Sequence, residues 1–157
     1  MSKAFTSEET EEAPVVVRPR APLPPGETNY VTPAGLAALT EELRGLDEAW
    51  PRLSIPERQA RGRAQLEARL ASAVVVDPKL QPQDEVRFGA RVVIQNSSGA
   101  HRTFQIVGID EADAREGKVA FVAPLARALL GRKVGEAVTV ATPRNDDELT
   151  VISIAYW

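Results

Sequence analysis

Cysteine is absent from the 157-residue chain, and there is a single histidine, His101. The first absence excludes a disulfide framework and thiolate metal sites, and the second leaves a zinc ion without its usual imidazole ligands. No apolar run approaches the roughly 18 residues that a membrane-spanning helix needs. Residues 1–10 also lack the basic start and apolar stretch of a secretory signal. We therefore expect a cytoplasmic protein without metal or cofactor.

The chain also carries no excess of positive charge. The formal net charge is -3, and the lysines and arginines are dispersed along the chain. A protein that depends on phosphate contacts normally carries a basic face and a high isoelectric point. We expect no autonomous, sequence-specific binding to nucleic acid, and a protein is the better candidate for a partner.

Residues 1–28 are acidic and rich in proline. Prolines at this density exclude helix and central strand, so the sequence predicts a disordered tail with some extended character. The residues that carry this prediction are Glu8, Glu9, Glu11, Glu12, Pro14, Pro19, Pro22, Pro24 and Pro25.

Residues 29–77 are predicted to form two antiparallel helices. Thr32 followed by Pro33 is typical of a helix start, and Pro51 ends the first helix. Ser54 and Glu57 have the spacing of a capping box for a second helix, which runs to about residue 73. The loop between the helices is too short for any arrangement but a hairpin. The narrow apolar seam of a short coiled coil is formed by Leu36, Leu39, Leu43 and Leu46.

After a linker at residues 78–84, the apolar period changes from helical to two, which predicts a β-sheet domain at residues 85–157. The turn at residues 96–99 predicts a hairpin, and Pro124 and Gly131 bound a short helix. The fold class is therefore α+β, with an antiparallel sheet and one short helix. Strands are expected at 86–88, at 91–94 beyond a bulge at Gly89, and at 102–107, 119–121, 136–141 and 149–155.

Several ordered blocks resemble the GreA/GreB family of bacterial transcription factors. The strongest is FVAPLARALLGRKVGE at residues 121–136, which resembles the family's signature segment. RFGA at 87–90, FQIVGIDEAD at 104–113 and NYVTPAGL at 29–36 resemble three further blocks, and residues 1–6 look like the opening of some GreB-like proteins. The similarity covers most of the chain.

The resemblance implies an FKBP-like C-terminal domain that docks on RNA polymerase near the secondary channel. It also implies a helical hairpin that reaches into that channel, where acidic residues at the tip help to position Mg²⁺. Here the tip reads AWPRLS at residues 49–54, without those acids, and both helices look shortened, as in Rnk-type relatives. We predict a polymerase-binding regulator that is not an enzyme and does not stimulate transcript cleavage. The alternatives are an active cleavage factor and a prolyl isomerase or chaperone module of the FKBP type.

Two groups of residues are the candidate partner-binding sites. The resemblance places the first at the polymerase, although apolar residues replace the family's polar contacts there; it comprises Asp110, Glu111, Val122, Ala123 and Pro124. The second is the predicted tip of the hairpin, where an aromatic residue and an arginine could anchor a partner; it comprises Trp50, Pro51, Arg52 and Leu53.

Each group also has a simpler interpretation. Trp50 could instead close the apolar seam, which we favour, and Asp110, Glu111 and Asp113 could be a solvated loop. The acids nearest the tip are interpreted as solvated or capping charges rather than as a metal site; they are Asp47, Glu48 and Glu57. A basic stripe for RNA is less favoured than a solvated helix face for Arg58, Arg61, Arg63 and Arg69.

Overall fold

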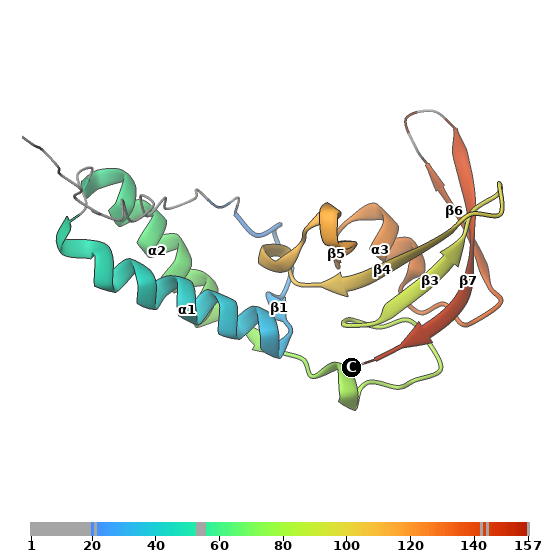
Figure 1. Cartoon of the computed structure of the whole chain (residues 1–157), viewed down its shortest axis with the longest axis horizontal. Helices are drawn as coiled ribbons and strands as arrows, with labels where there is room; N and C mark the ends of the chain where they lie inside the picture. The colour runs from blue at the N-terminus through green and yellow to red at the C-terminus, as the bar shows by residue number, and fades with distance from the viewer. Residues whose placement is uncertain (1–19, 21, 53–55, 142, 144, 157) are drawn as a thin grey trace, which may run out of the picture.

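The computed structural model describes residues 20, 22–52, 56–141, 143 and 145–156. Two helices, α1 (Pro33–Ala49) and α2 (Pro56–Ser72), occupy one end of the molecule, and a curled five-stranded sheet occupies the other (Figure 1). The prediction of helices and a sheet within one chain is confirmed. Among the described residues, no helix has the length and apolar character to cross a bilayer.

Helix α1 begins where the sequence predicts. Thr32 has extended backbone angles, its hydroxyl accepts a hydrogen bond from the Gly35 N–H at 3.0 Å, and Pro33 takes the first helical position. The helix ends at Ala49, and a 3-10 turn, η1 (Trp50–Arg52), follows. The predicted cap of α2 at Ser54 lies outside the described residues.

The two helices share a small apolar core. Val31, Leu39, Leu46 and Leu66 are buried together, and Leu36, Leu43, Trp50, Leu70 and Ala73 pack around them. Two short strands close this core at the end nearest the sheet: β1 (Tyr30–Val31) pairs in parallel with β2 (Val74–Val75). The sequence did not predict this pair. Its partners are 44 positions apart, so no local pattern announces it.

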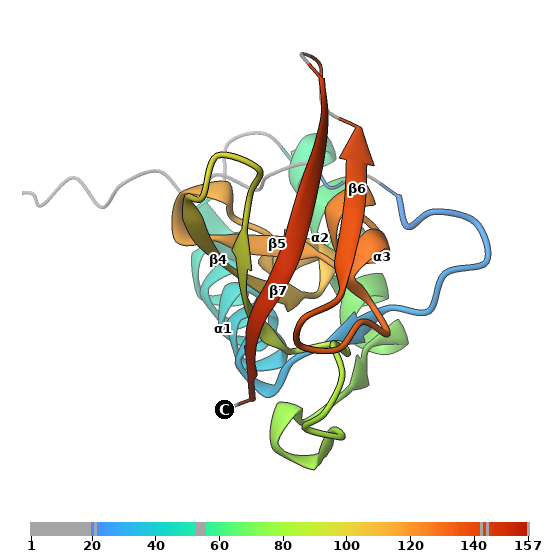
Figure 2. The same cartoon turned by 90° about the vertical axis from the view of Figure 1, so that its right-hand side faces the viewer.

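The large sheet has the strand order β5-β4-β3-β7-β6, and Figure 2 shows β7 beside the edge strand β6. Its strands are β3 (Arg91–Gln95), β4 (His101–Val107), β5 (Lys118–Ala120), β6 (Ala137–Ala141) and β7 (Asp146–Ala155). All neighbours are antiparallel except β4 and β5, which are parallel. The prediction of a wholly antiparallel sheet is therefore wrong at this edge. The 3-10 turns η3 (Ile109–Glu111) and η4 (Ala114–Glu116) carry the chain back along β4 before β5 begins.

Two further predictions need correction. Val86 and Phe88 are buried, but residues 86–88 form no strand, because Val86 bonds to a loop: its N–H donates to the Arg132 carbonyl at 2.8 Å, and its carbonyl accepts from Gly131 at 2.7 Å. Gly89 then turns the chain with φ +87°. Strand β7 begins at Asp146, before the predicted start at residue 149, because residues 146–148 pair with β6.

The sheet and α3 (Pro124–Leu129) enclose the larger core. Pro124 begins α3, and Gly131, with φ +83°, lies just beyond its end, as predicted. A further 3-10 turn, η2 (Pro78–Leu80), lies in the connection from the helices, and its Pro78 packs against Gly89. The core contains Val86, Phe88, Ala90, Val92, Ile94, Ile106, Phe121, Ala126, Leu129, Val138, Leu149 and Val151.

Candidate functional site

Val122, Ala123 and Pro124 form a short apolar loop between β5 and α3. Pro124 is exposed and the other two are half-buried. The loop is held in shape by two hydrogen bonds: the Ala123 N–H donates to the Ala120 carbonyl at 2.9 Å, and Arg127 Nε donates to the Val122 carbonyl at 2.7 Å. The loop therefore presents a fixed apolar surface.

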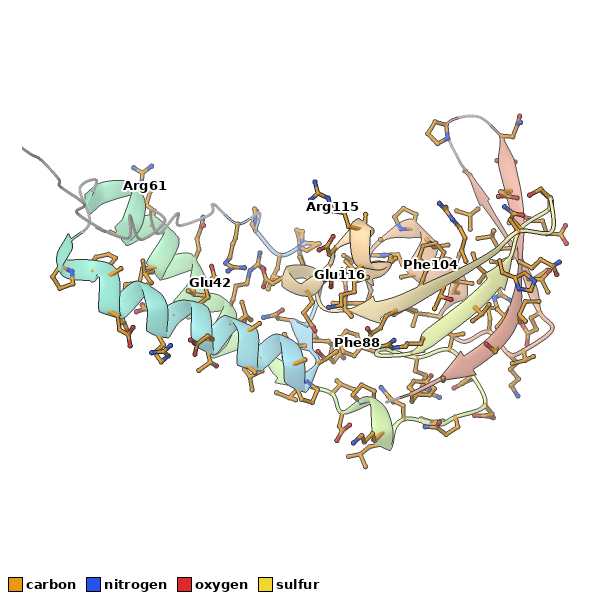
Figure 3. All side chains as sticks on the ribbon, in the orientation of Figure 1. Glu42, Arg61, Phe88, Phe104, Arg115 and Glu116 are labelled. Carbon is orange, nitrogen blue, oxygen red and sulfur yellow. The ribbon has the colours of Figure 1, made fainter. Side chains whose placement is uncertain are left out.

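A shallow hollow of about 650 Å³ lies beside this loop. Its apolar lining includes Phe104, Val119, Ala120 and Ala123, and Arg102 and Lys118 also line it. Phe104 is half-buried on β4 (Figure 3). The loop and the hollow together form one partly apolar surface beside the edge of the sheet.

Asp110 lies apart from this surface, between the sheet and the helices. Only 8% of its side chain is exposed. Its Oδ1 accepts a hydrogen bond from Arg20 Nη1 at 2.8 Å, and its Oδ2 lies 3.4 Å from Arg69 Nε, in ion-pair range without hydrogen-bond geometry. The solvated-loop interpretation is therefore wrong for Asp110, because two arginines from distant segments enclose it.

Glu111 has a different set of partners. Its carboxylate accepts hydrogen bonds from the backbone N–H groups of Thr32 and Gly108, both at 3.1 Å, and from the Thr32 hydroxyl. It thus binds directly at the start of α1, so the solvated-loop interpretation is wrong here too. Gly35 makes room for it, because a Cβ at that position would lie 2.2 Å from Glu111 Cδ. Asp113 is exposed, as the solvated interpretation predicts, and caps η4.

Trp50 lies at the far end of the helix pair. It is half-buried against the small apolar core, and the Arg63 guanidinium carbon lies 5.2 Å from the centroid of its ring. This is the packing expected of a residue that closes the apolar seam. Pro51 is exposed beside it, Arg52 ends η1, and Leu53 lies outside the described residues.

Two of the acids near this end have basic partners on the helices, and the side chain of Glu57 lies outside the described residues. Asp47 pairs with Arg63, and Glu48 pairs with Arg44. Hydrogen bonding to Glu67 raises the pKa of the Arg63 guanidinium, against the opposing effect of desolvation. Within the described part of the chain, no three histidine, cysteine or acidic side chains gather as a metal site would require.

The arginines for which a basic stripe is the less favoured interpretation do not share a single face, among those whose side chains are described. Arg61 is exposed and projects away from the helices (Figure 3), whereas Arg69 is buried beside Asp110. Arg63 is occupied by Asp47 and Glu67. The side chain of Arg58 lies outside the described residues. His101 is an exposed strand residue at the start of β4.

Sequence reasoning missed several residues that organise the region between the helices and the sheet. Arg20 and Glu27 fall in the segment predicted as a disordered tail, yet Arg20 contacts Asp110, and Glu27 pairs with Arg127 of α3 at 2.9 Å. Asn29 is only 2% exposed and donates to the Arg69 carbonyl at 2.9 Å. An arginine among prolines carries no local signal of such contacts, because its partners lie up to 90 positions away.

Comparison with known proteins identifies the family. Residues 81–156 match the family model described as "Transcription elongation factor, GreA/GreB, C-term". Transcription elongation factor GreB of Neisseria meningitidis is 34% identical over 154 residues, covering 82% of this chain and 94% of that protein. GreA of Thermodesulfovibrio yellowstonii is 42% identical over 97 residues, covering 60% of this chain and 61% of that protein.

Among solved structures, the prokaryotic transcription elongation factor GreA/GreB from Nitrosomonas europaea is similar, with a TM-score of 0.45 and 25% identity. That match covers 81% of this chain and 98% of the other. The similarity to GreB runs over nearly the whole of the relative and is joined by a family match across the sheet. The chain therefore belongs to the GreA/GreB family of transcription elongation factors.

Proposed function

We propose that this chain is a transcription regulator that binds bacterial RNA polymerase near its secondary channel and does not stimulate transcript cleavage. Membership of the GreA/GreB family supports polymerase as the partner. The observation that carries the loss of cleavage is the length of the helices: α1 and α2 have 17 residues each. At 1.5 Å per residue, such a helix is only about 25 Å long.

The alignment with GreB supports a shortened chain. The alignment is 154 positions long and spans 94% of GreB. It nevertheless covers only 82% of this chain, which has 157 residues. Positions of the relative are therefore left without a counterpart here. We place the missing stretch at the far ends of α1 and α2, where the family's acidic tip would be.

The charges at that end support the same conclusion. A carboxylate helps to hold Mg²⁺ only by touching the ion or its water shell. Asp47 and Glu48 are paired with arginines of the helices, and η1 contributes Trp50, Pro51 and Arg52, which bring no carboxylate. In this proposal the helix pair reaches toward the channel but delivers no metal ligand.

We propose the loop Val122–Ala123–Pro124, with the hollow beside it, as the main docking surface on the polymerase. The tip residues Trp50, Pro51, Arg52 and Leu53 form a second, smaller contact. Asp110 and Glu111 are already bound within the chain, so they support docking by holding the helices in place. We further propose that residues 85–157 have an FKBP-like fold, that residues 29–77 form a short coiled coil, and that the protein acts in the cytoplasm.

A binding assay with purified core polymerase tests the partner. We expect binding at micromolar concentration or tighter, competed by a cleavage-active GreA or GreB. Pro124→Glu places a charge on the docking loop and is expected to weaken binding at least tenfold. Pro143→Glu, on the exposed connection between β6 and β7, is the matched control and leaves binding unchanged. Absence of binding by the native chain, or equal loss in both variants, would remove the proposal.

A cleavage assay on stalled elongation complexes tests the second part of the proposal, that the chain does not stimulate transcript cleavage. At a concentration that saturates the polymerase, the chain is expected to release no more RNA than buffer alone. An authentic GreB serves as the positive control. Robust RNA release by this chain would show that it is an active cleavage factor, the principal alternative.

Prolyl isomerisation is the alternative from the enzyme class, and it has less support. Tyr30, Phe88 and Phe121 gather with ring centroids 5.5 to 5.9 Å apart. Phe88 and Phe121 are only 8% exposed, so these rings pack mainly against one another and the core. A proline-containing peptide is expected to isomerise at the background rate in the presence of the chain.

A further inference from the structure

The segment that precedes β1 crosses from the helices to the sheet. We call Arg20 together with residues 22–29 the N-terminal clasp. At its first residue, the Arg20 side chain bonds to Glu42 of α1 and to Asp110 of η3, the latter at 2.8 Å. The Arg20 backbone N–H also donates to Gln65 Oε1 of α2 at 3.0 Å. One residue thus touches both helices and the sheet domain, and Figure 3 shows Glu42 on the helix pair.

The bond between Arg20 and Asp110 is largely removed from water, whereas the side chain of Glu42, the partner of Arg20 on α1, is 43% exposed. The Arg20 side chain is 13% exposed, and those of Asp110 and Arg69 are 8% and 7% exposed. Burial opposes the charge of Arg20, yet the hydrogen bonds to Glu42 and Asp110 raise the pKa of its guanidinium. Removing one member of such a buried charge cluster leaves the others uncompensated. The contact is therefore costly to break.

The C-terminal end of the clasp, at Asn29, also binds the helix pair. Asn29 donates hydrogen bonds to the Arg69 carbonyl at 2.9 Å and to Ser72 Oγ at 3.2 Å, both at the end of α2. Between these ends, Glu27 pairs with Arg127 of α3 at 2.9 Å. The clasp consequently has partners on α1, α2, η3 and α3.

Apart from the clasp, the described contacts between the helix pair and the sheet domain gather around β1 and around Asp110. Glu111 binds at the start of α1 through Thr32. Gly108 packs directly against the backbone of Tyr30, because a Cβ atom at Gly108 would lie 2.6 Å from the Tyr30 carbonyl oxygen. These contacts, together with the packing of the Tyr30 ring against Phe88 and Phe121, surround β1 and the start of α1, and a contact at one place allows the helices to tilt about it. Asp110 lies at a second place, where Arg69 of α2 is 3.4 Å away and Arg20 of the clasp adds a hydrogen bond at 2.8 Å.

We infer that Arg20 is a positioning residue, and that the N-terminal clasp sets the direction in which the helix pair projects from the sheet domain. This inference concerns the protein alone and does not depend on binding to polymerase. It assigns a structural task to a proline-rich segment whose composition indicates none.

Distance measurements between two spin labels test the inference on the full chain. Because native cysteine is absent, Ala60→Cys on α2 and Thr139→Cys on β6, both at exposed positions, place one label on each part. In this background, Arg20→Ala is expected to broaden the distance distribution at least twofold. Arg44→Ala is the matched control: Arg44 also pairs with two carboxylates, Glu41 and Glu48, but both are on α1.

The control is expected to keep the native width. Glu42→Gln, which removes one of the two carboxylate partners of Arg20, is expected to give an intermediate width and serves as a second variant if Arg20→Ala loses helix content by circular dichroism. Native widths for both Arg20→Ala and Glu42→Gln, or equal broadening in Arg44→Ala, would overturn the inference.

Discussion

At the scale of single residues, the neighbouring acids Asp110 and Glu111 of η3 bind different parts of the chain. Asp110 lies against two arginines from segments far away in the sequence, and Glu111 binds at the first turn of α1. Neither carboxylate is free to act as a solvated surface charge. Both residues therefore help to join the helices to the sheet.

Tyr156 is a second residue whose environment has a measurable consequence. Burial raises the pKa of its hydroxyl, which donates to the Glu85 carbonyl at 2.5 Å and accepts from the Arg87 N–H at 2.8 Å. The folded state thus favours the neutral phenol. Stability from this preference is complete below the unfolded pKa of about 10 and is lost as the pH rises through the higher folded value.

We predict that Tyr156→Phe lowers the free energy of unfolding by about 1 kcal/mol at pH 8, because two hydrogen bonds are lost. Above pH 10 the native chain loses this advantage, so the difference between the two proteins shrinks. Urea denaturation of both proteins at pH 8 and pH 11 measures the effect. A difference that stays constant or grows with pH would contradict the prediction.

At the scale of elements, α1 contains two glycines with opposite surroundings. Helix propensity alone predicts that replacing either with alanine stabilises the helix by up to about 1 kcal/mol. At Gly45 nothing lies within 4 Å of an added Cβ. At Gly35 the same atom would meet the Glu111 carboxylate that binds Thr32.

We predict that Gly45→Ala raises the free energy of unfolding by about 0.5 to 1 kcal/mol. Gly35→Ala is expected to lower it by about 1 to 3 kcal/mol, because Glu111 must leave its partners. Urea unfolding followed by circular dichroism compares the two variants, each serving as the control for the other. If both alanines stabilise the chain, the close contact between α1 and Glu111 is wrong.

At the scale of the whole molecule, two apolar cores of unequal size are joined through η3 and the N-terminal clasp. Among the described residues, the core of the sheet and α3 is the larger, and that of the helix pair depends on a narrow seam. Local opening is easier where fewer apolar side chains are buried. The helix pair should therefore be the less stable part.

Amide hydrogen exchange measured by mass spectrometry tests whether the helix pair is less stable than the sheet. Peptides from α1 and α2 are expected to exchange at least tenfold faster than peptides from β3 and β7, since the central strands are buried in the larger core. The N-terminal half of β4, which is exposed, provides an internal comparison of intermediate protection. Equal protection of the helices and the central strands would mean that the two cores unfold as one unit.

The sequence by itself determined the local elements of this protein. Thr32 and Pro33 begin α1, Pro124 begins α3, and the turn at residues 96–99 joins β3 to β4, because each signal acts within a few residues. The family could also be recognised from ordered blocks along the chain.

Only the tertiary structure decided which side chains meet between the helices and the sheet. Arg20 and Asp110 are 90 positions apart, and Thr32 and Glu111 are 79 apart. The parallel pairing of β5 and the loop at residues 86–88 depend in the same way on segments outside any local window. Local hydrogen-bonding and steric preferences are written in short stretches of sequence, whereas burial of a charge depends on where distant parts of the chain come together.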